Sequence, residues 1–503
     1  MNRYSQFYLL SFLLFFLSSC NQKPNPVVLN SKDLYAQKCA LCHVAPTVDV
    51  LPKNLWVKFF PELGAKMGIL EPGYNPLKGM NINEIDAVIE SEYYTKNQVV
   101  TREQWEQLKE YIIQNAPDKI DNYQRSEHQF YNLDAFTPKK INLDNSPGTF
   151  ITFLSFQNDV LYYADLFGGF YTYNFKLSQS TEYKRFENAI VWYQKLKNGN
   201  EVFTEIGKLD PTEQRLGKLW IQRENQEKEL IVKELHRPVH TLSQDLNNDG
   251  SIEHIISEFG HLTGSISKIN SDATSELLWP NPGAIQTQMH DVNNDGMMDL
   301  VSLVAQGDEA IVSFIQQKNG DFKAEYLMRY QPNYGSSWFE MMDFDGDGDL
   351  DLITANGDNA DLTYTQKPYH GMRISLNDGY GNFKEAFFYQ LNGATRLVAE
   401  DFDQDNDIDI ALVSTFPDYE NHPEMAFIYL ENLGDFNFKE NIIEDVNFGR
   451  WFLLDKGDID KDGDIDILIS SFTYTFSPVP NEFQKTWEEN DVDLILLKNN
   501  LFK

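Results

Sequence analysis

The sequence predicts a small all-α domain followed by a large all-β domain that is built from repeated units. Residues 27–118 carry helix caps and amphipathic spacing. After residue 240, an acidic nine-residue motif recurs five times. The motifs are followed by short apolar runs, which are typical of strands beside Gly turns. The chain has 503 residues, of which 42% are hydrophobic, so it contains enough apolar side chains for both cores.

The N-terminal segment has the pattern of an export signal. The mostly apolar run at residues 8–17 is too short for an ordinary membrane-spanning helix. It ends in Leu-Ser-Ser-Cys at residues 17–20, which resembles the lipobox of bacterial lipoproteins. The resemblance implies a signal peptide of residues 1–19, a lipidated Cys20 and a tether of residues 20–26. The protein would then be lipid-anchored in the bacterial cell envelope, in the outer membrane facing the periplasm or at the cell surface. The alternative is an ordinary signal peptide with an incidental cysteine.

The other two cysteines form a C-x-x-C-H motif with Cys39, Cys42 and His43. In an exported chain this motif predicts covalent attachment of haem c. Two thiols on one helical turn can reach both vinyl groups, and the histidine offers a ring nitrogen to the iron. A thioredoxin-like motif would need a βαβ setting, and a zinc site would need a second ligand pair. These two alternatives are less favoured because the segment predicts a helix and no further cysteine pair is present.

The residues around the motif predict the rest of the α domain. Asn30 or Ser31 can cap a helix over residues 32–42, and Thr101 begins a capping box before a final amphipathic helix. This arrangement resembles a small cytochrome c domain over residues 27–118. The resemblance implies a sixth iron ligand, for which Met67 is preferred and Met80 is the alternative. Both could instead be packing residues, which would leave the iron five-coordinate or bound by a distant His.

The acidic motif places oxygen ligands at positions 1, 3, 5 and 9, usually with Gly at position 6, and its starts lie 46 to 58 residues apart. This spacing predicts calcium binding, because alternate carboxylates converge on one hard cation and Gly permits the sharp turn. The predicted calcium ligands are Asp245, Asn247, Asp249, Glu253, Asp291, Asn293, Asp295, Asp299, Asp343, Asp345, Asp347, Asp351, Asp401, Asp403, Asp405, Asp409, Asp458, Asp460, Asp462 and Asp466. EF-hands are excluded because position 12 is never Glu. In the fourth motif Asn406 replaces Gly and can still adopt a left-handed turn.

These loops resemble the calcium loops of FG-GAP/VCBS-type β-propellers, the repeat of integrin α heads. The resemblance covers residues 147–503 and implies one blade for each of the five motifs. Residues 147–240 hold strand-like runs without the motif and are long enough for two further blades. We therefore expect seven blades, with six or eight as alternatives. Residues 119–146 are expected to be a linker.

In integrin-like propellers such loops lie on the lower face, so the segments before and well after each motif would meet on the upper face. These segments are rich in Arg, His and mixed polar residues. Loops on a rigid scaffold commonly carry function, which suggests a polar pocket at the upper channel mouth. Its candidate residues are Arg237, Asp358, Asp361, His370, Arg396 and Arg450. The alternative is that these residues form ion pairs that join neighbouring blades.

The net charge of −34 excludes a nucleic-acid partner, which requires a basic face. No nucleophile elbow, Walker loop or dinucleotide fingerprint is present, so whether the protein is an enzyme stays open. The leading hypothesis is an envelope electron-transfer protein, whose propeller binds a redox partner protein or an oxidisable substrate. A second is a propeller that binds a glycan or protein, with an ancillary haem. A third is a periplasmic dehydrogenase that passes electrons to the haem.

Overall fold

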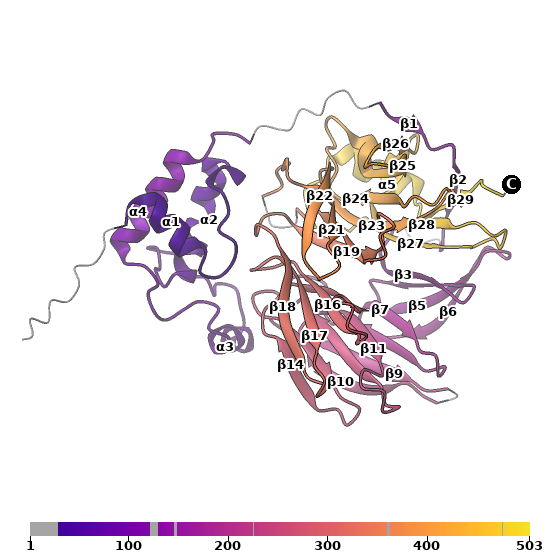
Figure 1. Ribbon diagram of the computed structural model, residues 1–503, viewed down its shortest axis with the longest axis horizontal. Helices are drawn as coiled ribbons and strands as arrows, with labels where there is room; N and C mark the ends of the chain where they lie inside the picture. Colours follow the sequence, from indigo (N-terminus) through magenta and orange to yellow (C-terminus); the bar gives the residue numbers. More distant parts are fainter. Residues whose placement is uncertain are drawn as a thin grey trace, which may run out of the picture.

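The structure, a computed structural model, describes residues 29–120, 129–144, 148–224, 226–359, 363–474 and 476–502. It consists of a helical region and a ring of seven β-sheets beside it (Figure 1). The predicted signal peptide, Cys20, the tether and Asp361 lie outside the described residues. Within the described ranges, no helix combines the length and the apolar character needed to cross a bilayer.

The helical region contains four α-helices and one short 3-10 helix. They are α1 (Ser31–Cys39), η1 (Val48–Val50), α2 (Lys53–Lys66), α3 (Ile82–Glu90) and α4 (Arg102–Asn115). The side chain of Asn30 caps α1, and Thr101 forms the predicted capping box with Gln104. Helix α1 packs on α4, with 5.5 Å between the ring centroids of Tyr35 and Tyr111. The region therefore has its own core, centred on Leu34, Trp56 and Trp105.

Helix α1 is shorter than the predicted helix over residues 32–42. It ends at Cys39, and Cys42 and His43 lie in the turn that follows. The capping signal correctly located the start of the helix, whereas the sequence carried no Gly or Pro to mark its end.

The all-β part is a seven-bladed β-propeller, as predicted (Figure 1). Each blade has four antiparallel strands, and a short fifth strand, described below, extends the sheet of blade 6. Blades 1 and 2 comprise β3 (Ile151–Gln157), β4 (Val160–Asp165), β5 (Gly169–Asn174) and β6 (Gln179–Arg185), then β7 (Ile190–Lys195), β8 (Glu201–Glu205), β9 (Gly217–Gln222) and β10 (Glu229–Leu235). Blades 3 and 4 comprise β11 (Pro238–Gln244), β12 (Glu253–Glu258), β13 (Ser265–Ile269) and β14 (Ser275–Trp279), then β15 (Ala284–His290), β16 (Asp299–Val304), β17 (Ala310–Gln316) and β18 (Phe322–Arg329).

Blades 5 and 6 comprise β19 (Ser336–Met342), β20 (Asp351–Asn356), β21 (Gly371–Asn377) and β22 (Phe383–Gln390), then β23 (Ala394–Glu400), β24 (Asp409–Ser414), β25 (Phe427–Asn432) and β26 (Phe438–Ile442). Blade 7 comprises β27 (Trp451–Gly457), β28 (Asp466–Ser471), β29 (Leu494–Asn499) and β2 (Phe136–Ile141). Short 3-10 helices η2 (Pro423–Ala426) and η3 (Val446–Phe448) and helix α5 (Asn481–Asn490) lie in connections of blades 6 and 7.

Residues 119–146 were expected to be a linker, but part of this segment forms strands of the propeller. Strand β2 lies within residues 119–146 and pairs with β29 as the outer strand of blade 7. Strand β1 (Tyr131–Asn132) pairs in parallel with β26 at the edge of blade 6. Four of the six residues of β2 are exposed, so this strand lacks the apolar run that identified the others. The N-terminal part of the propeller sequence thus closes the ring.

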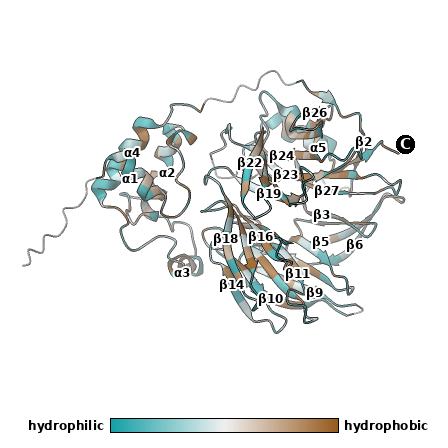
Figure 2. Cartoon of the chain, viewed as in Figure 1, coloured by the Kyte–Doolittle hydropathy of each residue, from teal (hydrophilic) through white to brown (hydrophobic). Residues whose placement is uncertain are grey.

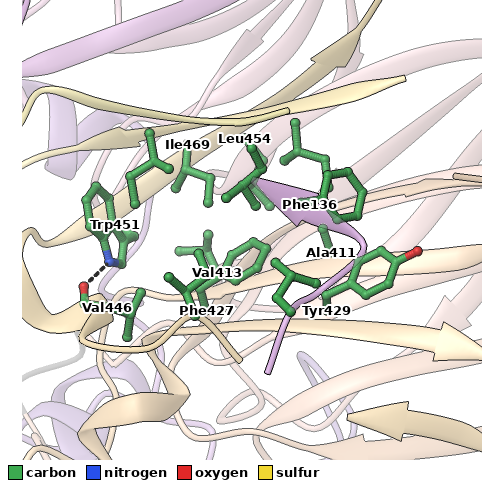
Figure 3. Close-up of a cluster of buried hydrophobic side chains, with 14 of the residues drawn as sticks. Phe136, Ala411, Val413, Phe427, Tyr429, Val446, Trp451, Leu454 and Ile469 are labelled. Atoms are coloured by element: carbon green, nitrogen blue, oxygen red, sulfur yellow. Dashed lines mark hydrogen bonds between the residues drawn. The ribbon is translucent and has the colours of Figure 1, made fainter. Parts of the chain in front are cut away.

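The cores lie between neighbouring blades. In blades 3 to 7 all six residues of the second strand are buried, which explains the apolar run after each acidic motif. Both the propeller strands and the helices carry hydrophobic and hydrophilic stretches, and the outer strand β6 is largely hydrophilic (Figure 2). Between blades 6 and 7, Phe136, Phe427 and Leu454 pack in one cluster, and Trp451 Nε1 donates to the Val446 carbonyl at 2.8 Å (Figure 3).

Candidate metal centres

All five acidic motifs occupy equivalent places in the fold. Each forms the loop between the first and second strands of its blade, in blades 3 to 7. Blades 1 and 2 have short turns there, which agrees with the absence of the motif from residues 147–240. The five loops therefore lie on one face of the propeller, which we call the lower face.

The loops share a backbone conformation that directs carboxylates inward. In the third loop, Gly348 N–H donates to Asp343 Oδ2 at 3.0 Å and Asp349 N–H donates to Asp347 Oδ1 at 2.9 Å. Positions 4 and 6 are left-handed, with φ of 76° at Gly346 and 97° at Gly348. Asn406 adopts the same conformation with φ of 73°, as predicted from its tolerance of left-handed turns.

Three loops gather three carboxylates whose ligand oxygens lie within 4.8 Å of one another. The clusters are Asp343, Asp345 and Asp351; Asp401, Asp403 and Asp405; and Asp458, Asp460 and Asp462. Asp343 Oδ1 is buried and has no hydrogen-bond partner within the described part of the chain, which suits an oxygen that coordinates a cation. Hard oxygen donors at this density fit calcium, since without a cation the like charges repel.

The first two loops differ because Asn occupies position 3. Their backbones repeat the pattern: Gly250 N–H donates to Asp245 Oδ2 at 2.9 Å and Gly296 N–H donates to Asp291 Oδ2 at 2.8 Å. An Asn oxygen is a neutral calcium ligand, so these two loops offer one negative charge fewer. We expect them to bind calcium more weakly than the all-Asp loops.

The carboxylate at position 9 has a second role that the spacing did not reveal. Asp351 accepts hydrogen bonds from Phe344 N–H at 2.9 Å and Asn377 N–H at 2.8 Å. Asp466 likewise accepts from Ile459 N–H at 3.0 Å and Asn499 N–H at 2.8 Å. Both acids are buried, and burial raises the pKa of Asp466 to about 6. Position 9 therefore ties the loop to the third strand of its own blade.

A recurring asparagine completes this tie. It stands at the end of the third strand as Asn377, Asn432 and Asn499, and its side-chain amide donates to the carbonyl at motif position 8 at 3.1 to 3.2 Å. The sequence did contain a signal for this asparagine. Strands β21 and β25 each end in Asn, and a turn with Gly and Phe follows directly. Sequence reasoning had noted that turn but not the Asn.

The fifth loop contains a competing cation. Lys498 Nζ, from β29, contacts a carboxylate oxygen of Asp460 and lies 3.6 Å from Asp462 Oδ2. Both acids belong to the carboxylate cluster of that loop. The ammonium group therefore partly neutralises the site that a divalent ion would fill.

We expect Lys498→Ala to increase the calcium affinity of the fifth loop, because a positive charge beside the ion is removed. An increase of roughly threefold to tenfold is reasonable for a partly exposed charge. Calorimetric titration with calcium, compared between Lys498→Ala and the wild type, would show the fifth loop as a tighter site. Lys485→Ala, on α5 and paired with Glu489, is the matched control. Identical isotherms for all three proteins would contradict the competition.

On the opposite, upper face, two predicted pocket residues join blades. Arg237 Nη2 donates to Leu209 O at 2.7 Å, and Nη1 contacts the Gly260 carbonyl. These carbonyls belong to loops of blades 2 and 3. Arg450 bonds in the same manner to loops of blades 6 and 7, with its Nη1 3.1 Å from Tyr474 O and its Nε 3.4 Å from Thr415 O. Burial lowers the pKa of Arg237 to about 10.

The other described pocket candidates belong to blades 5 and 6. Arg396 is on the inner strand β23, and its guanidinium carbon is 3.6 Å from the Trp338 ring centroid. His370 is the last residue of the loop between β20 and β21; its side chain is buried, and burial lowers its pKa. Asp358 begins that loop, whereas Asp361 is outside the described residues. No contact between described residues joins Arg237, Arg396 and Arg450 to one another.

In the helical region, the three haem-motif residues stay together at the end of α1. Cys39 is half-buried and Cys42 is exposed, and both are free thiols. Burial raises the pKa of Cys39 to about 12. The Nδ1 atom of His43 lies 2.8 Å from the Val44 carbonyl. Met67 caps α2 at the edge of the helical core, and Met80 lies half-buried before α3.

One segment of the chain matches a known family. Residues 291–354, in blades 4 and 5, match the family model described as FG-GAP-like repeat. No curated protein matches the chain. Similar solved structures include the N-terminal domain of Nup159 (12% identity, TM-score 0.40, 75% of this chain and 99% of that chain). An ancestral GH74 enzyme has 8% identity and a TM-score of 0.42, over 73% of this chain and 51% of that chain. An auxiliary nutrient binding protein from Bacteroides thetaiotaomicron has 10% identity and a TM-score of 0.36, over 57% of this chain and 72% of that chain. The chain is a seven-bladed β-propeller that contains an FG-GAP-like repeat in residues 291–354 and is preceded by a small helical region.

Proposed function

We propose that the protein is a c-type cytochrome of the bacterial cell envelope, in which a calcium-stabilised propeller binds a redox partner or a small substrate. The observation that carries the proposal is the C-x-x-C-H motif at the end of α1, with the ring of His43 held by the Val44 carbonyl at 2.8 Å. An iron-binding histidine commonly donates its second ring N–H to a backbone carbonyl, which fixes the tautomer.

The residues present fit a covalent haem. Cys39 and Cys42 would add their S–H groups across two vinyl groups, a step that needs no oxidant. His43 Nε2 would face the iron, because Nδ1 is engaged by Val44. Met67 or Met80 would supply a thioether as the distal ligand. When bound, haem supplies one-electron chemistry, and the surrounding helices would exclude water from it.

Contacts between the two parts support a functional connection. Glu84 Oε1, on α3, accepts from Thr212 Oγ1 at 2.6 Å in blade 2. Tyr369 O–H, in blade 5, donates to the Val50 carbonyl at 3.0 Å and packs against the helical core. Blades 2 and 5 lie on opposite sides of the ring, so the helical region spans the upper face. A molecule bound there would lie close to the helical region.

The membrane anchor is part of the same proposal, supported by the residues before Cys20. It predicts that palmitate label is incorporated into the full chain and not into Cys20→Ser. Labelled Cys20→Ser would contradict lipidation at this residue.

The decisive experiment is an oxidised-minus-reduced absorption spectrum of protein made in a host that attaches haem c. We expect covalent haem, retained after denaturation, and its complete loss in the double variant Cys39→Ser/Cys42→Ser. His43→Ala should keep the covalent pigment with an altered spectrum. Wild-type protein without haem after competent maturation would refute the proposal and leave the second hypothesis, a propeller that binds a glycan or protein. Substrate-dependent haem reduction would favour the third, a dehydrogenase.

A further inference from the structure

The first strand of each blade faces the central channel, and the third residue of these strands forms one layer around it. The layer consists of Phe153, Trp192, His240, Gln286, Trp338, Arg396 and Leu453. Rings in the layer touch: Trp192 lies 4.1 Å from His240 and 6.0 Å from Phe153 between centroids. The layer combines aromatic surfaces with polar groups, as small-molecule sites do.

Arg396 is held in this layer by stacking and not by an ion pair. Its guanidinium lies 3.6 Å above Trp338, and the described residues give it neither a hydrogen bond nor an ion pair. The side chain is partly exposed, which on an inner strand means that it borders the channel. A stacked guanidinium keeps its N–H edges available for a ligand.

Two more polar groups in the layer have no hydrogen-bond partner among the described residues. Gln286 is 6% exposed and its Oε1 accepts no hydrogen bond. Trp192 Nε1–H is buried and donates to no acceptor. His240 Nδ1 faces Thr287 N–H at 3.5 Å, which leaves Nε2 as the protonated nitrogen. Buried polar groups without a partner are costly, so an acceptor and a donor in one channel layer indicate a ligand.

The fifth residues of the same strands form a second layer that contains two acids. Glu340 Oε2 accepts from Ala399 N–H at 3.2 Å, and an oxygen of Asp455 accepts from Phe156 N–H. One oxygen of each acid thereby accepts a backbone N–H of the inner strand in the next blade. Glu340 also bonds to the Trp338 side chain and Asp455 to the Ser155 side chain, and each carboxylate keeps further lone pairs that can accept.

The charges around the channel favour a neutral ligand. Arg396 is opposed by Glu340 and Asp455, and Lys456 is paired with Glu400 at 2.8 Å. An anion would meet two carboxylates, and a cation would meet Arg396. Hydroxyl groups can both donate to Gln286, Glu340 and Asp455 and accept from Arg396 and Trp192.

We propose that the central channel binds a small neutral polyhydroxylated molecule, a sugar or polyol, between Arg396 and Trp338 on one side and His240 and Gln286 on the other. This site does not depend on the haem, so its failure and the failure of the proposed function are separate results.

The test uses the calcium-loaded full chain and saturation-transfer NMR with glucose, galactose, mannose, xylose and glucitol, followed by calorimetry. We expect at least one of them to bind with a Kd of about 1 mM. Arg396→Met and Gln286→Leu should each weaken binding about tenfold. Lys439→Met, a cation on the outer strand β26 paired with Glu431, is the matched control and should change nothing. Where Gln286→Leu fails to fold, Gln286→Glu is the second variant.

Three results would overturn the proposal. The first is no binding of any of the five compounds, which would assign the unpartnered groups to water. The second is binding that both channel variants leave unchanged. The third is tighter binding of gluconate than of glucitol, which would make the channel an anion site.

Discussion

Removal of calcium with EDTA is expected to lower the melting temperature of the full chain by roughly 5 to 10 °C. A ligand that binds only the folded state stabilises it by about 2.7 kcal/mol when present at 100 times its Kd. Three loops place three carboxylates within 4.8 Å of one another, so their repulsion adds to the loss. Differential scanning calorimetry with and without calcium measures the shift, and added calcium should reverse it.

The controls for this result come from the chain itself. Asp343→Asn/Asp345→Asn should remove one bound ion and part of the shift, because Asn retains an acceptor for Gly348 N–H but not the charge. Asp272→Asn, in the exposed turn between β13 and β14, should leave the shift intact. A melting curve that thorough chelation does not move would refute the calcium assignment.

The second large effect is expected at motif position 9. Asp351→Ala should destabilise the protein by roughly 2 to 4 kcal/mol both with and without calcium. The reason is that two backbone N–H groups lose their acceptor, that of Asn377, which is buried, and that of Phe344, which is partly buried. Urea unfolding in both conditions measures it.

Asp343→Asn is the comparison for this experiment. Its destabilising effect acts through the ion, so once calcium is removed it should be at least as stable as the wild type, because one of the repelling charges is gone. If Asp351→Ala also lost its effect in EDTA, position 9 would act solely as a metal ligand, and the structural tie to the third strand would be refuted.

The parts of the fold that sequence predicted are those that repeat. Five acidic motifs fixed the positions of blades 3 to 7, and the buried second strands carried the apolar runs that identified strands. Chain length between residue 147 and the first motif then supplied two more blades. The helix caps at Asn30 and Thr101 were readable because capping depends on residues three apart.

The parts that sequence missed depend on contacts between distant segments. Strand β2 has exposed Lys139 and Lys140 at its centre and becomes a strand because β29 offers an open edge. The sequence placed Arg237 and Arg450 in segments before their motifs. It could not show that each guanidinium bonds to carbonyls of loops from two neighbouring blades.

The pairing of β2 with β29 also sets an order of events during synthesis. The helical region contacts itself locally and can fold as soon as residues 29–120 have been made. The ring cannot: its last blade needs one strand from before blade 1 and three from after blade 6. Until β29 emerges, β2 waits unpaired and blade 1 has no neighbour on one side. A chain crossing a membrane in an extended form would therefore complete its propeller only after nearly all of it had been exported.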